Sequence, residues 1–184
     1  NFKVIWMIIV TGWLGFIGSN IIKGLNKIGQ KNITICDWLN KKDRKIYISN
    51  FQYNEIIRPD KLFSFVQTSN KIDIIIHMGA ISSTTEKNFK LIYKNNTIFS
   101  KKIWKLCVIK NIRLIYASSA ATYGDGKKGF SDNESINYNP LNLYGWSKYF
   151  FDRYAIKNSL SQKKPPQWVG LKFFNVYGPN EYHK

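Results

Sequence analysis

The feature of this sequence that most constrains its fold is an apolar run followed by three evenly spaced glycines. The run Ile8-Ile9-Val10 is β-branched throughout, which is typical of a buried strand. Gly12, Gly15 and Gly18 follow it, and apolar residues then recur at helical spacing. Glycines at such a junction permit a tight turn and let a pyrophosphate approach the amino end of the helix. Because Asp37 closes the next apolar run, where a carboxylate can bind a ribose, we predict a dinucleotide-binding turn.

The rest of the chain alternates in the same way between apolar runs and amphipathic stretches. Strands are predicted at 33–36, 72–77, 113–117 and 168–174, with a weak strand at 46–48, and helices at about 17–28, 59–66, 90–110 and 143–158. This alternation predicts an α/β fold of the Rossmann type, a doubly wound parallel sheet with helices on both faces. We assign residues 7–184 to one NAD(P)-binding domain and residues 1–6 to an upstream extension.

The composition argues against several classes of protein. The chain of 184 residues carries 28 Lys and Arg against 11 Asp and Glu, but these lysines are spread along it and no nucleic-acid-binding motif accompanies them. No apolar run approaches the roughly 20 residues that span a bilayer, and the amino end lacks the pattern of a signal peptide. We therefore expect a cytoplasmic protein that binds neither nucleic acid nor a membrane. Cys36 and Cys107 lie in apolar stretches and are expected to be buried, reduced thiols, and no metal-ligand spacing is present.

A tyrosine and a lysine four residues apart indicate acid–base chemistry. In Tyr144-Gly145-Trp146-Ser147-Lys148 the two side chains share one face of a predicted helix, one turn apart. A free tyrosine titrates near pH ~10, too high for a base at neutral pH. We expect the ammonium of Lys148 and a nicotinamide cation to lower the pKa of Tyr144. Ser119, just after the strand at 113–117, is placed to orient a substrate and share the proton.

The residues after the second strand leave the choice of cofactor open. Asp37 favours NAD, because its carboxylate would accept hydrogen bonds from the adenosine ribose. Arg44, with Lys41, Lys42 and Lys45 beside it, would instead pair with the 2′-phosphate of NADP.

Several motifs together resemble a known family. The glycine turn, "HMGA", "YASSAATYG", "YGWSK" and "FFNVYGP" occur in the order found in the extended short-chain dehydrogenases/reductases. Three longer stretches, "ISSTTE", "PLNLYGWSK" and "FFNVYGPNEYHK", are similar to the ADP-L-glycero-D-manno-heptose 6-epimerase family within that group. The resemblance covers about residues 7–184 and is weakest at 40–59.

The resemblance implies a nucleotide-sugar epimerase that acts on ADP-heptose for lipopolysaccharide core synthesis. Bound NADP would remove hydride from C6 of the heptose and return it to the other face. Tyr144 and Lys184 would be the two acid/base groups, and Lys148 would hold the nicotinamide ribose. The implied substrate contacts are Ser119, Asn175, Val176 and Lys184. The implied cofactor contacts are Gly12, Gly15, Phe16, Ile17, Gly18, Asp37, Trp38, Arg44, Met78, Gly79, Ala80, Ile81, Ser82, Asn95, Tyr144 and Lys148.

Two departures from the family pattern shape the expectations. The family turn reads Gly-Gly-Ala-Gly, so Trp13 and Leu14 are expected to add bulk beside the pyrophosphate, and replacing them with Gly-Ala is expected to tighten NADP binding. The family also has a carboxy-terminal portion that completes the sheet and forms a substrate lobe. We expect a domain truncated before that lobe, with poor turnover by itself, and a homo-oligomer at full length. A UDP-hexose 4-epimerase, a 4,6-dehydratase and a non-catalytic nucleotide-binding remnant remain alternatives.

Overall fold

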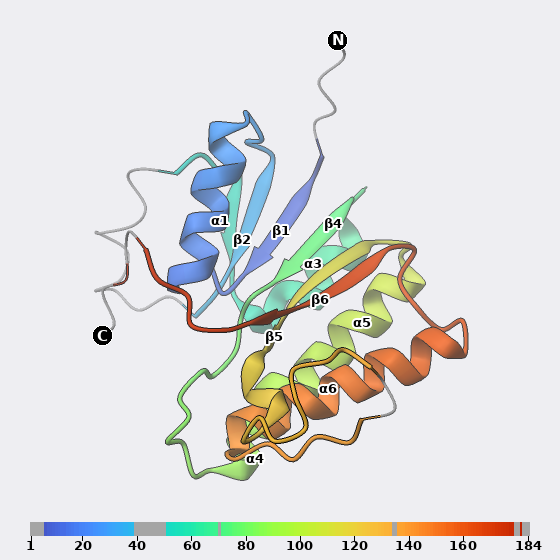
Figure 1. Ribbon diagram of the computed structural model, residues 1–184. Helices are drawn as coiled ribbons and strands as arrows, with labels where there is room; N and C mark the ends of the chain where they lie inside the picture. The colour runs from blue at the N-terminus through green and yellow to red at the C-terminus, as the bar shows by residue number, and fades with distance from the viewer. Residues whose placement is uncertain (1–5, 39–50, 70, 134–135, 179–180, 182–184) are drawn as a thin grey trace.

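The computed structural model describes residues 6–38, 51–69, 71–133, 136–178 and 181, and one parallel sheet forms its centre. The six strands lie in the order β3-β2-β1-β4-β5-β6 (Figure 1). Their bounds are Ile8–Thr11 for β1, Ile33–Cys36 for β2, Glu55–Ile57 for β3, Ile74–His77 for β4, Arg113–Ser119 for β5 and Trp168–Phe173 for β6. Every neighbouring pair is parallel. The order reverses between β1 and β4, as it does in a doubly wound sheet, so the predicted fold class is confirmed.

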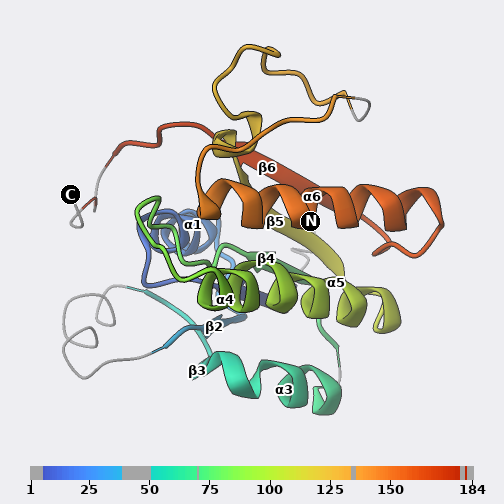
Figure 2. The same ribbon diagram turned by 90° about the horizontal axis from the view of Figure 1, so that it is seen from below.

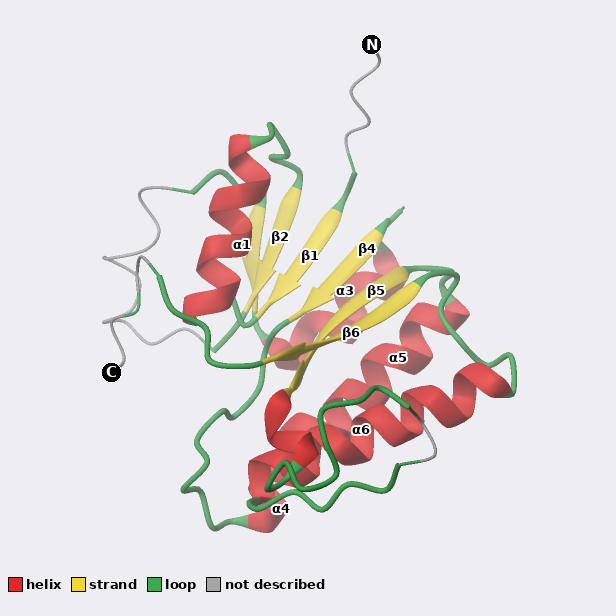
Figure 3. Cartoon of the chain, in the orientation of Figure 1, coloured by secondary structure: helices red, strands yellow, loops and turns green. Residues whose placement is uncertain are grey.

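Helices connect the strands in the alternation that the sequence predicts (Figure 3). The α-helices are α1 (Phe16–Lys27), α3 (Leu62–Thr68), α4 (Phe89–Ile92), α5 (Phe99–Ile109) and α6 (Leu143–Leu160). Between α4 and α5 the chain forms a π-helix, η3 (Tyr93–Ile98), and two 3₁₀ turns are η2 (Pro59–Lys61) and η4 (Ala120–Tyr123). No helix among the described residues has the length and apolar character needed to cross a bilayer.

Two apolar clusters cover the two faces of the sheet. Ile9 of β1 packs with α3, α5 and α6, whereas Ile8 and Val10 face the side that carries α1. Figure 2 shows α3, α5 and α6 as one layer of roughly parallel helices. Strands buried on both faces read as unbroken apolar runs, which is why β1, β2 and β4 are easily found in the sequence.

The structure differs from the sequence prediction in two elements. The third strand is β3, a three-residue segment with one exposed end, whereas the strand predicted at 46–48 lies outside the described residues. The helix predicted at 90–110 is interrupted by η3, so that its path combines α4, the π-helix and α5. A π-helix of this kind is common at functional sites, and η3 faces the carboxyl edge of the sheet, where the predicted site residues gather.

Candidate active site

The glycine turn joins β1 to α1 at the carboxyl edge of the sheet. Gly12 has a φ of +73°, and a Cβ atom on it would lie 2.5 Å from the backbone nitrogen of Gly79. A side chain at Gly18 would overlap the carbonyl oxygen of Gly12. Gly15 is the N-cap residue of α1, and because glycine has no side chain, no side-chain acceptor caps the first turn of the helix. The turn, the start of α1 and the loop after β4 therefore meet backbone to backbone, and the partial positive charge of the helix end favours a phosphate.

Trp13 is not a wall of the phosphate site, and the expectation that its side chain adds bulk there is wrong. The indole is 0% exposed and packs between the sheet and α1, in the cluster that contains Val10 and Ile22. Its φ is not positive, so the turn accommodates it without backbone strain. Leu14 is half-buried against the same cluster. Both side chains therefore support the turn from inside the core.

A cavity of about 530 Å³ opens beside the turn. Seven residues predicted to contact a cofactor line it, namely Gly12, Asp37, Trp38, Gly79, Ala80, Ile81 and Asn95. The other lining residues, which the sequence analysis did not find, are Thr11, Cys36, Pro59, Asp60, Phe63, Lys94, Ile98, Phe99 and Lys102. Pro59, Phe63 and Phe99 give this cavity an apolar part that suits a flat base, and Asp37 supplies an acceptor. A glycine cradle beside such a slot fits a dinucleotide.

Asp37 ties the end of β2 to the glycine turn. Its Oδ2 accepts a hydrogen bond of 3.1 Å from the backbone N–H of Leu14, and its Oδ1 accepts one of 2.8 Å from the N–H of Trp38. Trp38 is 51% exposed, and the guanidinium of Arg58 lies 5.1 Å from the centroid of its ring. The carboxylate is thus oriented by backbone donors at the cavity wall, next to an exposed aromatic ring and a cation.

The π-helix positions two adjacent asparagines for different tasks. Asn95 lines the cavity, and its amide donates to the carbonyl of Leu91. Asn96 is 1% exposed, and its amide pairs with both the N–H and the C=O of Ile81, at 2.8 and 2.9 Å. The same amide donates to Ser147 Oγ at 3.0 Å. Asn96 therefore links the cavity loop to α6, a function that the sequence analysis missed because it considered only Asn95.

His77 links the turn to the π-helix through buried hydrogen bonds. Thr11 Oγ1 lies 2.7 Å from His77 Nδ1, and Ser100 Oγ lies 2.8 Å from His77 Nε2. Because Ser100 donates its only hydroxyl proton to the Asn96 carbonyl, Nε2 carries the ring proton and Nδ1 accepts from Thr11. Thr11 Oγ1 in turn accepts from the N–H of Gly79. Burial, with a smaller contribution from Lys148, lowers the pKa of His77 to about 3, so the ring is neutral.

Ser119, Tyr144 and Lys148 come together where β5 ends and α6 begins. The Ser119 hydroxyl hydrogen bonds to the Tyr144 phenol, and Lys148 Nζ lies 6.0 Å from the centroid of the Tyr144 ring. Lys148 is 4% exposed, and its Nζ donates to the carbonyl of Ala117 at 2.7 Å. Asn142 caps α6 by accepting from the Gly145 N–H at 2.8 Å, which fixes the first turn of the helix.

Lys148 does not lower the pKa of Tyr144 in the way that the sequence predicts. Burial raises the pKa of Tyr144, and the hydrogen bond from Ser119 lowers it only in part. Lys148 faces the ring and bonds to β5, rather than donating to the phenol oxygen, so the lysine does not offset the desolvation of a phenolate. Burial also lowers the pKa of Lys148, to about 8. The phenol is therefore the neutral, protonated partner of the pair.

The remaining predicted residues lie around this edge or outside the described part. Phe16 and Ile17 form the first turn of α1 and are half-buried, and Met78 to Ser82 form the loop after β4. Asn175 is exposed and Val176 half-buried in the segment after β6. Arg44 and Lys184, and the lysines near Arg44, lie outside the described residues. The two cysteines, Cys36 and Cys107, are buried free thiols, as predicted. Burial raises the pKa of each thiol to about 12.

Comparison with known proteins places these features in a family. Residues 8–184 match the family model of the NAD dependent epimerase/dehydratase family. The chain is 46% identical to an ADP-L-glycero-D-manno-heptose-6-epimerase of Fusobacterium nucleatum over 97% of its own length and 55% of that protein. The chain thus spans about half the length of the curated relatives it matches.

Solved structures give the same grouping. A crystal structure of ADP-L-glycero-D-manno-heptose-6-epimerase from Helicobacter pylori is 28% identical, with a TM-score of 0.78 over 97% of this chain and 58% of that one. MoeE5 in complex with UDP-glucuronic acid and NAD is 25% identical, with a TM-score of 0.73 over 94% of this chain and 56% of that one. The glycine turn, the strand order and these matches agree, and the chain belongs to the NAD dependent epimerase/dehydratase family.

Proposed function

We propose that this chain carries the cofactor-binding and acid–base part of an ADP-heptose 6-epimerase that serves lipopolysaccharide core synthesis. The observation that carries the proposal is the group formed by Ser119, Tyr144 and Lys148 at the same sheet edge as the glycine turn. The substrate class rests on the names of relatives that are 46% identical to the chain. Because the chain spans about half of these relatives, the activity is proposed for the whole protein, and slow turnover for the chain alone.

The proposed reaction needs a proton to leave and return to a hydroxyl at the carbon that is inverted. The nicotinamide cofactor, when bound, takes up hydride from that carbon and gives it back. Tyr144 keeps its phenol proton at neutral pH, because burial raises its pKa, and is suited to protonate the oxygen of the transient ketone. Ser119 orients that phenol through their hydrogen bond. In the opposite direction the phenolate accepts the proton of the sugar hydroxyl. Lys184 is proposed as the acid–base group for the other isomer.

Lys148 is proposed to hold the cofactor ribose. Its ammonium is fixed by the 2.7 Å bond to the Ala117 carbonyl, so it does not depend on the cofactor for its position. With a pKa of about 8 it is mostly protonated at pH 7 and supplies a positive charge in a buried place, where charge acts strongly.

Membership of an NAD dependent family indicates a nicotinamide cofactor, and we propose that it is NADP. Cations support the choice. Lys94 and Lys102 line the cavity, and Arg58 lies against Trp38 at its wall. The Asp37 carboxylate already accepts two backbone N–H groups. Arg44 is proposed to join these groups at a 2′-phosphate. Titration by tryptophan fluorescence, with Trp38 at the cavity wall, is expected to give a lower Kd for NADP than for NAD; a lower Kd for NAD would contradict the proposal.

The activity is tested by incubating the chain with NADP and each of three substrates, followed by NMR of the sugar. We expect slow inversion at C6 of ADP-heptose, and no inversion at C4 of UDP-glucose or UDP-galactose. Tyr144→Phe is expected to abolish conversion, whereas Tyr149→Phe, a half-buried tyrosine on the same helix, is the matched control. Inversion of a UDP-hexose in place of ADP-heptose would refute the substrate, and conversion that survives in Tyr144→Phe would refute the assigned acid–base group.

A further inference from the structure

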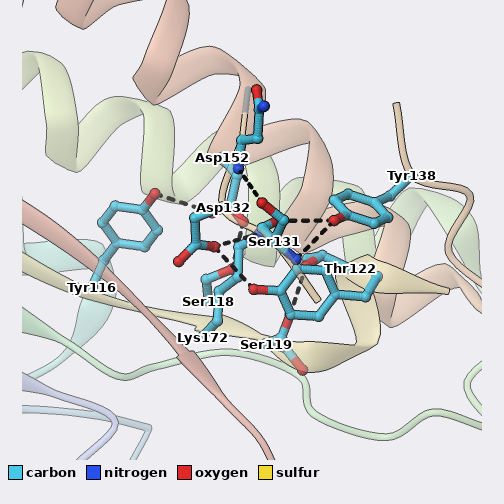
Figure 4. A network of polar contacts seen from close by, with 11 residues as sticks. Tyr116, Ser118, Ser119, Thr122, Ser131, Asp132, Tyr138, Asp152 and Lys172 are labelled. Atoms are coloured by element: carbon cyan, nitrogen blue, oxygen red, sulfur yellow. Dashed lines mark hydrogen bonds and ion pairs between the residues drawn. The ribbon is translucent and has the colours of Figure 1, made fainter. Parts of the chain in front are cut away.

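Asp152 is a buried carboxylate that the proposed chemistry does not use. It lies on α6 one turn after Lys148 and is 6% exposed. Figure 4 shows its carboxylate against β5, where Ser118 Oγ donates to Oδ2 at 2.5 Å and the Tyr116 hydroxyl donates to Oδ1 at 3.0 Å. Two donors from alternate residues of one strand thus fix a carboxylate in the interface between β5 and α6.

Charged groups face Asp152 from two elements. Lys148 approaches from the same helix and is itself buried, and Lys172 approaches from β6 with a side chain that is 21% exposed. Lys172 Nζ also lies 3.3 Å from the carboxylate of Asp132, a side chain that is 80% exposed. The same Nζ lies 4.2 Å from the centroid of the Tyr123 ring. Lys172 therefore has another carboxylate to balance it, whereas Asp152 is the carboxylate whose charge acts on Lys148.

The buried ammonium of Lys148 requires such a counter-charge. A backbone carbonyl such as that of Ala117 accepts one hydrogen bond but carries no net charge, and an uncompensated buried cation is driven towards its neutral form. Burial lowers the pKa of Lys148, and Asp152 opposes that change. Burial raises the pKa of Asp152, whereas Ser118, Lys172, Tyr116 and Lys148 oppose that change. Each charge thus favours the ionised form of the other inside the same helix turn.

We propose that Asp152 is a positioning residue that keeps Lys148 in its ammonium form and, through Ser118, holds α6 at the register on β5 that brings Tyr144 to Ser119. The contacts are consecutive along β5, since Ala117 binds Lys148, Ser118 binds Asp152, and Ser119 meets Tyr144. Three neighbouring residues of one strand therefore each hold one group of one helix. The inference rests on the proposed function for its consequence in catalysis, but the electrostatic coupling of Asp152 to Lys148 can be measured without cofactor or substrate.

The test compares Asp152→Asn with Asp132→Asn in the chain labelled with ¹³C at the lysine side chains. Asparagine keeps the shape of the side chain and removes its charge. We expect the NMR titration of Lys148, assigned with Lys148→Met, to shift to lower pH by at least about one unit, tenfold in acidity, in Asp152→Asn. Asp132→Asn leaves the titration of Lys148 unchanged. An unchanged titration in Asp152→Asn overturns the proposal.

The coupling is reciprocal, which gives a second test if Asp152→Asn fails to fold. Lys148→Met removes the ammonium and is expected to raise the pKa of the Asp152 carboxyl, measured by the ¹³C signal of that group; no change overturns the proposal. In an active enzyme, the loss of rate on the alkaline side is expected to begin at lower pH in Asp152→Asn, because less of Lys148 is charged. If Lys148 titrates as expected and the rate profile does not move, the electrostatic coupling of Asp152 to Lys148 is supported and the proposed function of Lys148 is refuted.

Discussion

Replacement of Trp13 by glycine is expected to destabilise the fold rather than to widen the cofactor site. The glycine found in the family turn looks like an improvement from the sequence. In the structure, however, the indole is 0% exposed and fills the space between α1 and the sheet, beside Ile22 and Val10. Glycine would leave a cavity beneath the turn. It would also free the backbone at position 13, so that Gly12 and Gly15 would no longer be held in their present positions.

The size of the loss follows from the area removed from the core. A buried tryptophan covers roughly 150–250 Å², which at about 25 cal/mol per Å² corresponds to about 4 to 6 kcal/mol. Trp13 Nε1 has no hydrogen-bond partner among the described residues, and removing a buried, unpaired donor returns about 1 to 3 kcal/mol. The free energy of unfolding is therefore expected to fall by about 3 kcal/mol. With an m-value of about 2 kcal/mol/M, the urea midpoint falls by roughly 1.5 M.

Two further variants test whether Trp13 is a core residue. Trp13→Phe keeps an apolar ring and removes the unpaired N–H, so its stability should stay within about 1 kcal/mol of the wild type. Trp38→Gly removes a ring that is 51% exposed and contacts Arg58, and should lose about 1 kcal/mol or less. Equal losses for Trp13→Gly and Trp38→Gly would show that Trp13 is not a core residue. Tighter NADP binding by folded Trp13→Gly would show that its bulk does oppose the cofactor.

Three other outcomes are expected from the geometry. Gly12→Ala should weaken NADP binding at least tenfold in a fluorescence titration, because the φ of Gly12 is +73° and its Cβ has no room; Gly24→Ala, with nothing within 4 Å, is the control and should raise stability by about 1 kcal/mol. The pKa of His77 is lowered to about 3 in the folded chain, so as the pH falls the unfolded chain takes up this proton first. The contribution of His77 to stability is therefore full above about pH 6.5 and is lost between there and about pH 3. The urea midpoint should fall over this range, and it should fall less in His77→Asn. Cys36 and Cys107, with pKa values near 12, should resist a thiol reagent at pH 8 until urea is added; rapid labelling of the folded chain would contradict their burial.

Most of the sheet could be predicted because its strands are buried on both faces. An unbroken β-branched run such as Ile74–His77 leaves little choice of structure, and the alternation with helices then sets the topology. β3 could not be found in this way, since three residues with an exposed Glu55 have neither an apolar run nor a clear alternation. Its place in the sheet comes from pairing with β2, which is a tertiary contact and leaves no local pattern.

The site divides in the same manner. Glycine positions and the spacing from Tyr144 to Lys148 predict which residues gather at the carboxyl edge, because the backbone period places them there. The direction of a side chain at a turn is decided by the core beneath it, so the sequence could not tell that Trp13 points inward. The π-helix was hidden for a similar reason: no local pattern in Tyr93–Ile98 encodes the wider turn, and the buried side chains of Asn96 and Thr97 are held by hydrogen bonds to Ser147 of α6.

Those contacts explain why polar residues occupy the core between the two halves of the site. Hydrogen bonds run from Thr11 through His77 to the π-helix, where the side chain of Asn96 holds Ile81 on one side and Ser147 on the other. The side chains of Thr11, His77, Asn96 and Ser147 are buried, so the loss of any one of them leaves a buried partner unpaired at a cost of about 1 to 3 kcal/mol. Apolar side chains would permit the layers to slide, whereas a chain of donors and acceptors allows one arrangement. The distance from the glycine turn to the first turn of α6 is therefore fixed by hydrogen bonds. A substitution at Thr11 is expected to shift the position of α6, the helix that carries Tyr144.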